Sequence, residues 1–419
     1  MRKLIFAVLL LLVLCAGAYA VGDQAYLGIF AETSLTKMPG MPAMPDFEMP
    51  PGSGEEGMPD MSQLGDLGNL PGMPDLSKLG GKPDAGGMPD MMAMMSFGKP
   101  QRQLNVRLWS PTIAAPDAFA FIVPPAGLKQ GKKLDLELYR PKPETTSTGP
   151  DTDAPDTEAI KPMNFTIKIY WGSSEKVRAG QPRIIKVGDM PAEQKARMEQ
   201  EMRKASKGDG SQYFYKPGWT TAYWPTKKQP GKIANDASLL GNFALTTNYT
   251  GNIAIDVPNT VDFMAPIEMS SPDLEKPVSM DSFIPFKWAA ISNALGLHAQ
   301  ITGMQGEDTL ILWFSAEKEP EMAVDWDYLE MAKVKEYVKA GVMMTGTQTA
   351  MTVPEAIFKD CDMTMFRMIG YGTGTALAAG QPIPRVQTKT TLSITPLGGK
   401  MAKDMMSGMS DPSEGDASE

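Results

Sequence analysis

The feature that most constrains the fold is an alternation of apolar and polar side chains with a period of two residues. Near the C-terminus it runs without a break, and Val386, Thr388, Thr390, Leu392 and Ile394 share one face. Shorter runs with the same period occupy residues 103–109, 118–123, 132–139, 164–171, 211–215, 242–247, 252–257, 283–288, 297–302, 309–314 and 363–369. A period of two is that of a β-strand with one buried face. The pattern predicts a mainly β protein, built as two sandwich-like β domains.

Helical spacing occurs in two places only, so one or two short helices are expected. Pro191 to Ser206 carries a narrow apolar stripe on a charged surface, and Asp189 offers an N-cap. Asp327 to Ala340 has apolar residues at helical spacing and is followed by Gly341, a residue suited to ending a helix.

A low-complexity arm separates the first residues from the β-rich part. Residues 37–99 number 63 and hold 12 Met, 12 Gly and 10 Pro, but no Val, Ile or Thr. Without β-branched residues a sheet is disfavoured, and Pro or Gly at every few positions disfavours a helix. We therefore predict a disordered N-terminal arm over residues 37–100.

These patterns divide the chain into segments. A short N-terminal segment, 21–36, holds the apolar piece Ala25 to Phe30, which is interpreted as a lone strand. The first β domain is predicted over 101–262 with a mobile loop at 140–162, and the second over 263–399. Residues 400–419 are polar, and we expect a disordered tail.

Part of the second β domain carries a motif. Phe286-x-Trp288 is followed by Asn293-Ala294-x-Gly296, by the run 297–302 and by a strand that holds Trp313. Over residues 265–315 this resembles strand B, the turn and strand C of fibronectin type III-like or immunoglobulin-like β-sandwiches. The resemblance implies a fold class and transfers no site, because such sandwiches serve many functions.

The first twenty residues predict export. Arg2 and Lys3 precede the apolar run Leu4 to Leu14, and Ala18-Tyr19-Ala20 fits a signal-peptide cleavage site. A signal peptide over 1–20 indicates a periplasmic, cell-surface or extracellular protein. Cys15 leaves a lipoprotein as the alternative. No later run is apolar and long enough for a membrane helix, so no transmembrane segment is expected in the mature chain.

Charge and composition narrow the function classes. Removal of Arg2 and Lys3 moves the net charge from -9 to -11, which gives the chain no electrostatic reason to bind nucleic acid or anionic lipid. Cys361 is the one cysteine outside the signal peptide, so no internal disulfide is expected, and burial as a small apolar side chain is favoured over an intermolecular disulfide. His298 is the only histidine, and its alternating run predicts a solvent-facing strand position.

Several constellations allow a chemical and a structural interpretation. The methionines of the arm allow two interpretations. Thioethers are soft ligands suited to Cu(I) or Ag(I), so the arm is a metal site, or else the arm is a plain linker. These methionines include Met38, Met41, Met44, Met91, Met92, Met94 and Met95. The aromatic cluster Tyr213, Tyr215, Trp219, Tyr223 and Trp224 fills a core, or else stacks on sugar rings or a partner.

The remaining constellations favour structural roles. Gly370-x-Gly372-x-Gly374 is interpreted as a glycine-rich turn or bulge rather than a phosphate loop. Asp325-Trp326-Asp327 is interpreted as a helix cap with a neighbouring acid rather than a glycosidase pair. Asn164-Phe165-Thr166 and Asn248-Tyr249-Thr250 fit the N-glycosylation sequon.

No catalytic, cofactor-binding or metal-ligating residue is assigned from the sequence, and no cofactor is expected. The first hypothesis is an exported, non-enzymatic cell-envelope binding or structural protein with an unknown protein or glycan partner. One alternative is a periplasmic soft-metal binder that works through the methionine-rich arm. The other is a carbohydrate-active hydrolase that uses Asp and Glu.

Overall fold

A computed structural model describes residues 24–40, 98–140, 165–191, 193, 218–276, 278–320, 329–375 and 381–409. Over these residues the chain is mainly β, as the alternation predicts, and its strands form several sheets. Several predicted segments lie outside the described residues. They are the predicted signal peptide, most of the methionine-rich arm, most of the loop 140–162, the predicted strand at 211–215 and the end of the polar tail.

The largest sheet, here called the main sheet, has eleven strands. In spatial order they are β5 (Glu137–Tyr139), β8 (Thr220–Trp224), β2 (Gln101–Ser110), β1 (Tyr26–Lys37), β18 (Ile383–Gly398), β17 (Met363–Gly372), β13 (Ala294–Gln305), β14 (Thr309–Phe314), β6 (Thr166–Trp171) and β7 (Arg183–Lys186), and β15 (Met344–Thr345) also pairs with β13. β1 is parallel to β18, and β14 is parallel to β6, so the sheet is mixed.

Among the described residues, two smaller sheets and two helices accompany the main sheet. Sheet B consists of β10 (Ile253–Val257), β9 (Gly241–Thr247), β3 (Ala120–Val123) and β4 (Leu134–Asp135), in that order. Sheet C consists of β11 (Met269–Ser271), β12 (Ile284–Trp288) and β16 (Ala350–Val353). The helices are α4 (Met331–Ala340) and α5 (Lys400–Met409), and single 3-10 turns lie at Ala126–Leu128 and Val187–Asp189.

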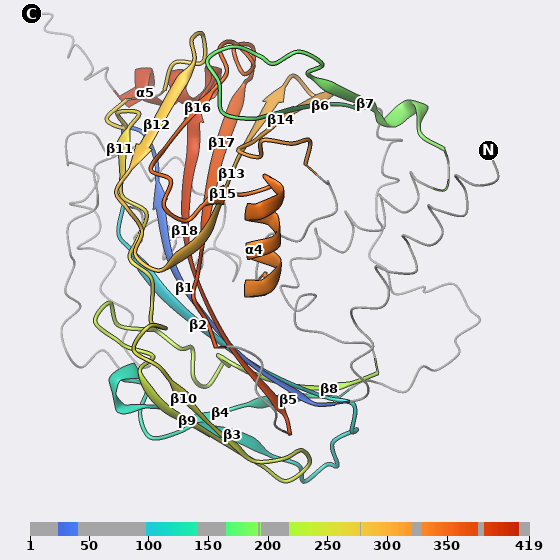
Figure 1. Cartoon of the computed structure of the whole chain (residues 1–419), viewed down its shortest axis with the longest axis vertical. Helices are drawn as coiled ribbons and strands as arrows, with labels where there is room; N and C mark the ends of the chain where they lie inside the picture. The colour runs from blue at the N-terminus through green and yellow to red at the C-terminus, as the bar shows by residue number, and fades with distance from the viewer. Residues whose placement is uncertain are drawn as a thin grey trace, which may run out of the picture.

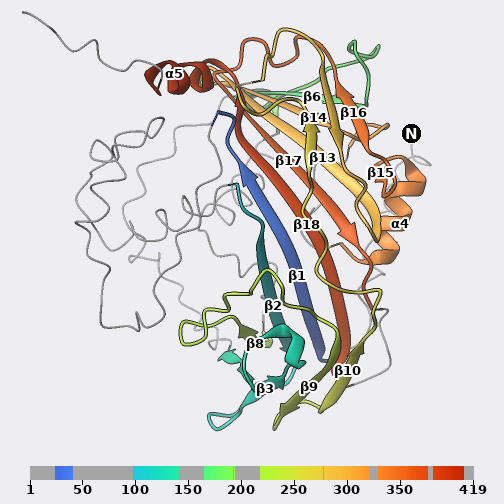
Figure 2. The same cartoon turned by 90° about the vertical axis from the view of Figure 1, so that its left-hand side faces the viewer.

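The main sheet is strongly curved. In Figure 1 it opens toward α4, which lies on its concave side, while sheets B and C lie on its convex side. Figure 2 shows β1, β2, β17 and β18 running side by side along the molecule, with β9 and β10 near one end and β16 near the other. The long central strands therefore connect the two ends of the molecule.

Two apolar cores lie on the convex side. One contains Leu27, Ile29 and Val386 of the main sheet together with side chains of sheet B such as Phe243. The other contains side chains of sheet C and of the opposite half of the main sheet, and Phe286 of β12 stacks on Phe366 of β17 with ring centroids 4.7 Å apart. Both cores therefore share the main sheet.

Near the middle of the chain, two successive residues belong to different cores. Phe263 belongs to the core under sheet B, and Met264 belongs to the core under sheet C. Residues 101–262 and 263–399 thus contribute mainly to different cores. Even so, strands of both ranges belong to the main sheet, in which β18 hydrogen-bonds to β1 on one side and to β17 on the other.

The apolar piece Ala25 to Phe30 belongs to a longer element than the lone strand expected. β1 extends from Tyr26 to Lys37, is central in the main sheet, and pairs with β18 and β2. Because β1 and β2 are antiparallel neighbours, the methionine-rich segment connects two adjacent strands. Gly98 N–H donates to Thr36 O at 2.8 Å, and Gly40 N–H donates to Leu274 O at 2.9 Å, so both ends of the segment are anchored.

The helices match the sequence pattern in part. α4 has Glu330 at its N-cap, so the prediction that Asp327 caps the helix is wrong; Gly341 ends it with a φ of 74°, donating its N–H to Tyr337 O and Val338 O. The helix predicted at 191–206 lies almost wholly outside the described residues. Residues 400–409 form α5, in the segment for which composition predicted a disordered tail, and Ala402 is buried. Among the described residues no helix is long and apolar enough to span a membrane.

Candidate functional site

The concave side of the main sheet carries the candidate site. Leu27, Ile29 and Ala31 of β1 point into the convex core, so Tyr26, Gly28, Phe30 and Glu32 face the concave side. The same alternation in β2 places Leu104, Val106 and Leu108 in the core and turns Asn105, Arg107 and Trp109 to the concave side. The period-two pattern thus sorts apolar residues to the core and aromatic and polar residues to the open face.

A row of aromatic side chains crosses four strands at one end of this face. Tyr26 of β1 is opposite Trp109 of β2, Trp109 is opposite Thr221 of β8, and Thr221 is opposite Tyr139 of β5. Tyr139 is 45% exposed, Trp109 and Tyr26 are half-buried, and Thr221 is a small residue between two rings. We call Tyr26, Trp109 and Tyr139 the aromatic row.

Polar side chains lie directly beside the aromatic row. Glu137, Tyr223, Arg107 and Gly28 form the next line of paired residues across the same strands. The Arg107 guanidinium carbon lies 5.5 Å from the centre of the Tyr223 ring, and the side chain donates to Trp224 O at 2.7 Å and to Asn105 Oδ1 at 3.3 Å. Partial burial, and secondarily the hydrogen bond and charge of Glu137, raise the pKa of Tyr223.

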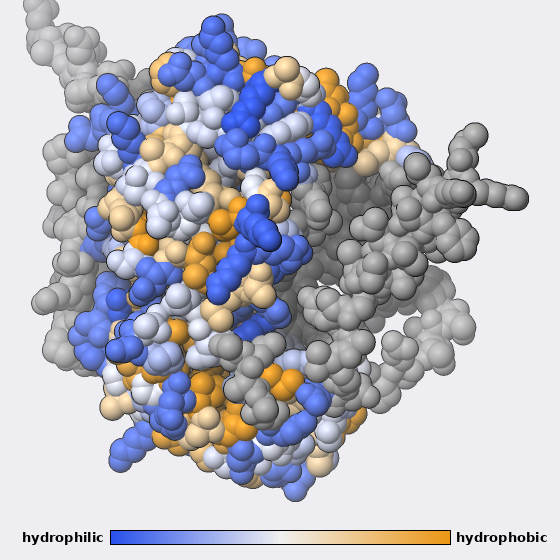
Figure 3. All heavy atoms as spheres, viewed as in Figure 1, coloured by the Kyte–Doolittle hydropathy of each residue, from blue (hydrophilic) through white to orange (hydrophobic). Residues whose placement is uncertain are grey.

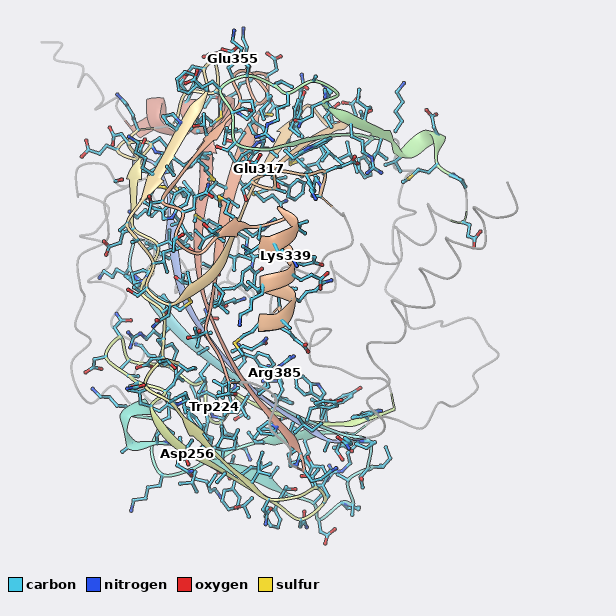
Figure 4. All side chains as sticks on the ribbon, viewed as in Figure 1. Trp224, Asp256, Glu317, Lys339, Glu355 and Arg385 are labelled. Atoms are coloured by element: carbon cyan, nitrogen blue, oxygen red, sulfur yellow. The ribbon has the colours of Figure 1, made fainter. Side chains whose placement is uncertain are left out.

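Because Gly28 has no side chain, the rings of Phe30 and Trp109 can contact each other beside the aromatic row. A Cβ atom on Gly28 would lie 2.4 Å from Cε2 of Phe30 and 3.2 Å from Cζ3 of Trp109. Phe30 therefore lies over the backbone of Gly28 and meets Trp109 edge to face, with ring centroids 6.1 Å apart. The Arg385 guanidinium carbon lies 5.5 Å from the centre of the Phe30 ring, and Arg385 pairs with Glu330 at 2.8 Å. Figure 4 shows Arg385 below α4, and Trp224 nearer sheet B.

A buried ion pair occupies the centre of the concave side. Lys389 of β18 is opposite Glu32 of β1, and Lys389 Nζ lies 3.1 Å from Glu32 Oε2. The side chains are 2% and 14% exposed. Tyr371 of β17 is opposite Lys389 on the other flank and packs with Val334 of α4. α4 thus packs on the concave side of β13 and β17, on the flank of Lys389 where Tyr371 lies.

The prediction that His298 faces solvent is wrong. Its ring points to the concave side, away from Leu297 and Ala299 as expected, but the residue is 3% exposed. The concave side is covered at this point, and Phe314 of β14 lies with its ring centroid 6.0 Å from that of His298. Burial, with a smaller contribution from the charge of Arg367, lowers the pKa of His298 to about 3. A buried, neutral imidazole is poorly placed to serve a substrate as a general base.

The aromatic cluster of the sequence is divided between the two faces of the sheet. Trp224 is buried in the core under sheet B, as favoured from the sequence, whereas Tyr223 points to the concave side and Trp219 is half-buried. Tyr213 and Tyr215 lie outside the described residues. The sequence did not single out Trp109, Tyr139 or Tyr26, although the outward positions of the alternating runs 103–109 and 132–139 hold the first two.

The other residues of interest have structural positions. Cys361 is a free, buried cysteine, as predicted, and burial raises the pKa of its thiol to about 11. A Cβ atom on Gly372 would lie 2.2 Å from Thr388 Oγ1, and Gly372 adjoins a register shift between β13 and β17, so the glycine-rich motif is strand and bulge.

Three sequence candidates fall outside what the structure describes. Asp325, Trp326 and Asp327 and nearly all of the arm methionines lie there, as does Asn164 of the first sequon. Among the described residues no group of three or more His, Cys, Asp or Glu side chains is arranged to hold a metal ion.

Comparison with known proteins gave no match to any family model, curated protein or solved structure.

Proposed function

We propose that the protein is an exported, non-enzymatic cell-envelope binding protein, and that it binds a glycan on the aromatic row. The observation that carries the proposal is the row itself, in which Tyr26, Trp109 and Tyr139 lie in register across neighbouring strands on the concave side. Neighbouring strands are about 4.8 Å apart, so Trp109 and Tyr139, two strands apart, present faces at about 10 Å.

The chemistry around the row supports a sugar ligand. A pyranose ring has apolar C–H faces and a rim of hydroxyl groups, so it needs an apolar platform beside hydrogen-bonding groups. Aromatic side chains supply the platform with little loss of conformational freedom. Glu137, Arg107 and Asn105 supply acceptors and donors next to it, which is the usual mixture in small-ligand sites.

The two cores support a finer proposal on the fold. We propose that each small sheet and the part of the main sheet that it covers act as a sandwich-like unit, of fibronectin type III-like character over residues 265–315. The motif strand that holds Phe286 and Trp288 is in sheet C, and the following strand is in the main sheet. Strands B and C of such sandwiches likewise belong to different sheets.

A glycan array with matched variants tests the proposed function. The wild-type mature protein is expected to bind one class of oligosaccharide, and Trp109→Ala/Tyr139→Ala is expected to weaken that binding at least tenfold, by the loss of two stacking platforms. Phe283→Ala, which removes an exposed aromatic side chain elsewhere, serves as the control. Binding that is equal in the double variant and the wild type, or no binding by the wild type, contradicts the proposal.

A further inference from the structure

Two lysine-bearing loops lie side by side next to sheet B. Gln130 of the first loop donates its side-chain N–H to Lys232 O of the second at 2.8 Å. Asp135 N–H donates to Gln229 Oε1 at 2.9 Å, so the loops touch at two points. Their lysines are all exposed, and they are Lys129, Lys132, Lys133, Lys227, Lys228 and Lys232. We call this set the lysine loops.

The lysine loops form a basic region in an acidic protein. Residues 126–136 and 226–236 hold these six lysines against two aspartates, whereas the whole chain has a net charge of -9. Lys129 pairs with Asp236, and Lys133 pairs with Asp135 at 2.7 Å. None of the other four lysines has a carboxylate within ion-pairing distance in the described part of the chain. Their charges are therefore available to an external anion.

Apolar side chains adjoin these lysines on the outer surface of sheet B. Ala120 and Ile122 of β3 point into the core, so Phe121 and Val123 point outward. Phe119 stacks on Phe121 with ring centroids 6.1 Å apart, and Lys133 Nζ lies 4.8 Å from the centre of the Phe121 ring. Phe119 is 45% exposed and Val123 is 44% exposed. The lower part of Figure 3, over sheet B, shows hydrophobic and hydrophilic residues next to one another.

Charges are separated across sheet B. The lysine loops adjoin β4, at one edge of the sheet, and Asp256 projects from β10 at the other edge, where Asn242 donates to it at 2.8 Å. Figure 4 shows Asp256 on β10, far from α4. The apolar residues of β3 therefore lie nearer the basic edge than the acidic one.

From this arrangement we propose that the outer surface of sheet B and the lysine loops dock the protein on an anionic lipid surface. Clusters of four to eight basic side chains bind anionic headgroups, and neighbouring aromatic and aliphatic side chains enter the interfacial region. A soluble polyanion would use the lysines but would gain nothing from exposed Phe119 and Val123. The combination of charge and apolar surface is what favours a membrane.

The docking surface is separate from the candidate glycan site. The core under sheet B lies between the outer surface of sheet B and the aromatic row, because both sheets contribute to that core. A protein docked through sheet B would therefore hold the concave side away from the lipid. The proposal does not depend on the proposed function, since it rests on different residues.

Flotation with lipid vesicles tests the docking surface. The full mature protein is mixed with vesicles of phosphatidylcholine alone or of phosphatidylcholine with phosphatidylglycerol. The charge variant is Lys132→Glu/Lys227→Glu/Lys228→Glu, and the apolar variant is Phe119→Ser/Val123→Ser. The matched control reverses three exposed lysines elsewhere, Lys318→Glu/Lys335→Glu/Lys359→Glu, so that net charge changes equally. Thermal melts confirm that each variant is folded.

Binding to anionic vesicles, absence of binding to neutral ones, and loss of binding at high salt are expected for the wild type. The charge variant should bind at least a hundredfold more weakly, in line with the contribution of each basic side chain near an anionic surface. The apolar variant should weaken binding severalfold, and the control should bind nearly as the wild type does. The proposal is overturned if the control and the charge variant lose vesicle binding equally. It is also overturned if the wild type does not bind anionic vesicles. An apolar variant that binds normally shows a purely ionic contact and overturns it too.

Discussion

His298 is buried on β13 against Phe314, so its protonation is coupled to unfolding. The pKa is lowered from 6.5 to about 3 in the folded protein, and the unfolded chain therefore binds the proton first as the pH falls. Well above pH 6.5 the residue is neutral in both states, and its effect on stability is constant. Between pH 6.5 and about 3 the free energy of unfolding should fall by about 1.4 kcal/mol per pH unit from this residue alone.

His298→Leu should remove that pH dependence. Urea unfolding at several pH values between about 6.5 and 5, where most carboxylates stay ionised in both states, measures the difference. The gap between the wild-type and variant free energies of unfolding should shift by about 1.4 kcal/mol per pH unit, in favour of the variant as the pH falls. Parallel stability curves would show that the imidazole is not buried in this way.

Cys361 should be unreactive in the native protein. Its thiol is buried in the core under sheet C and its pKa is raised to about 11, so little thiolate forms near neutral pH and a reagent has no access. Labelling with a thiol reagent at increasing urea concentration should follow the unfolding transition seen by circular dichroism. Rapid labelling without denaturant, or a disulfide-linked dimer on a non-reducing gel, would contradict the burial.

At the scale of elements, the ion pair between β1 and β18 joins the two parallel central strands. Lys389→Met leaves Glu32 without its buried counter-ion and should lower the free energy of unfolding by about 3 kcal/mol. Glu32→Leu/Lys389→Met should recover most of that loss, because two apolar side chains can replace a buried pair. Denaturant unfolding measures both.

The ion pair of Arg385 with Glu330 provides the comparison, since Glu330 is half-exposed. Arg385→Met should cost about 1 kcal/mol or less. If the double variant of the buried pair loses as much as the sum of its single variants, the two side chains do not interact across β1 and β18.

Most elements could be predicted from the sequence, but their pairing could not. The run that holds Phe165, Ile167 and Ile169 matches β6, and the long run near the C-terminus matches β18, because alternation is a local signal. β7, β8, β11, β15 and β16 were not predicted, and each of them has five residues or fewer. β5, β8 and β2 are distant in sequence, so nothing local indicates that Tyr139 and Trp109 share a row.

The face on which each side chain lies was also predictable, whereas the burial of the concave face was not. Alternation places His298 on the other face of β13 from Leu297 and Ala299, and that assignment is correct. Burial of the concave side depends on α4, which packs Val334 and Val338 against Gly296 of β13. The packing of a helix against a sheet is a tertiary contact, and the alternation of residues within one strand does not predict it.

At the scale of the whole molecule, the methionine-rich segment connects two neighbouring strands. Replacing residues 41–97 with a short Gly/Ser turn should leave the melting temperature of the mature protein unchanged or raise it, because shortening a connection lowers its closure entropy by about 0.6 kcal/mol per halving. Thr36, Gly40 and Gly98 are kept, since their backbone contacts hold the two ends. A shortened protein that melts well below the wild type would show that the segment packs on the β-rich part.

The central claim is that the concave side of the main sheet is the binding surface, and hydroxyl-radical footprinting tests it most directly. The mature protein is oxidised alone and with saturating oligosaccharide from the array, and modified residues are identified by mass spectrometry. Protection of Trp109, Tyr139 and Tyr223, with Phe119 and Phe283 unchanged, is the predicted result. Protection confined to sheet B or to sheet C, with the aromatic row oxidised as in the free protein, would contradict the account.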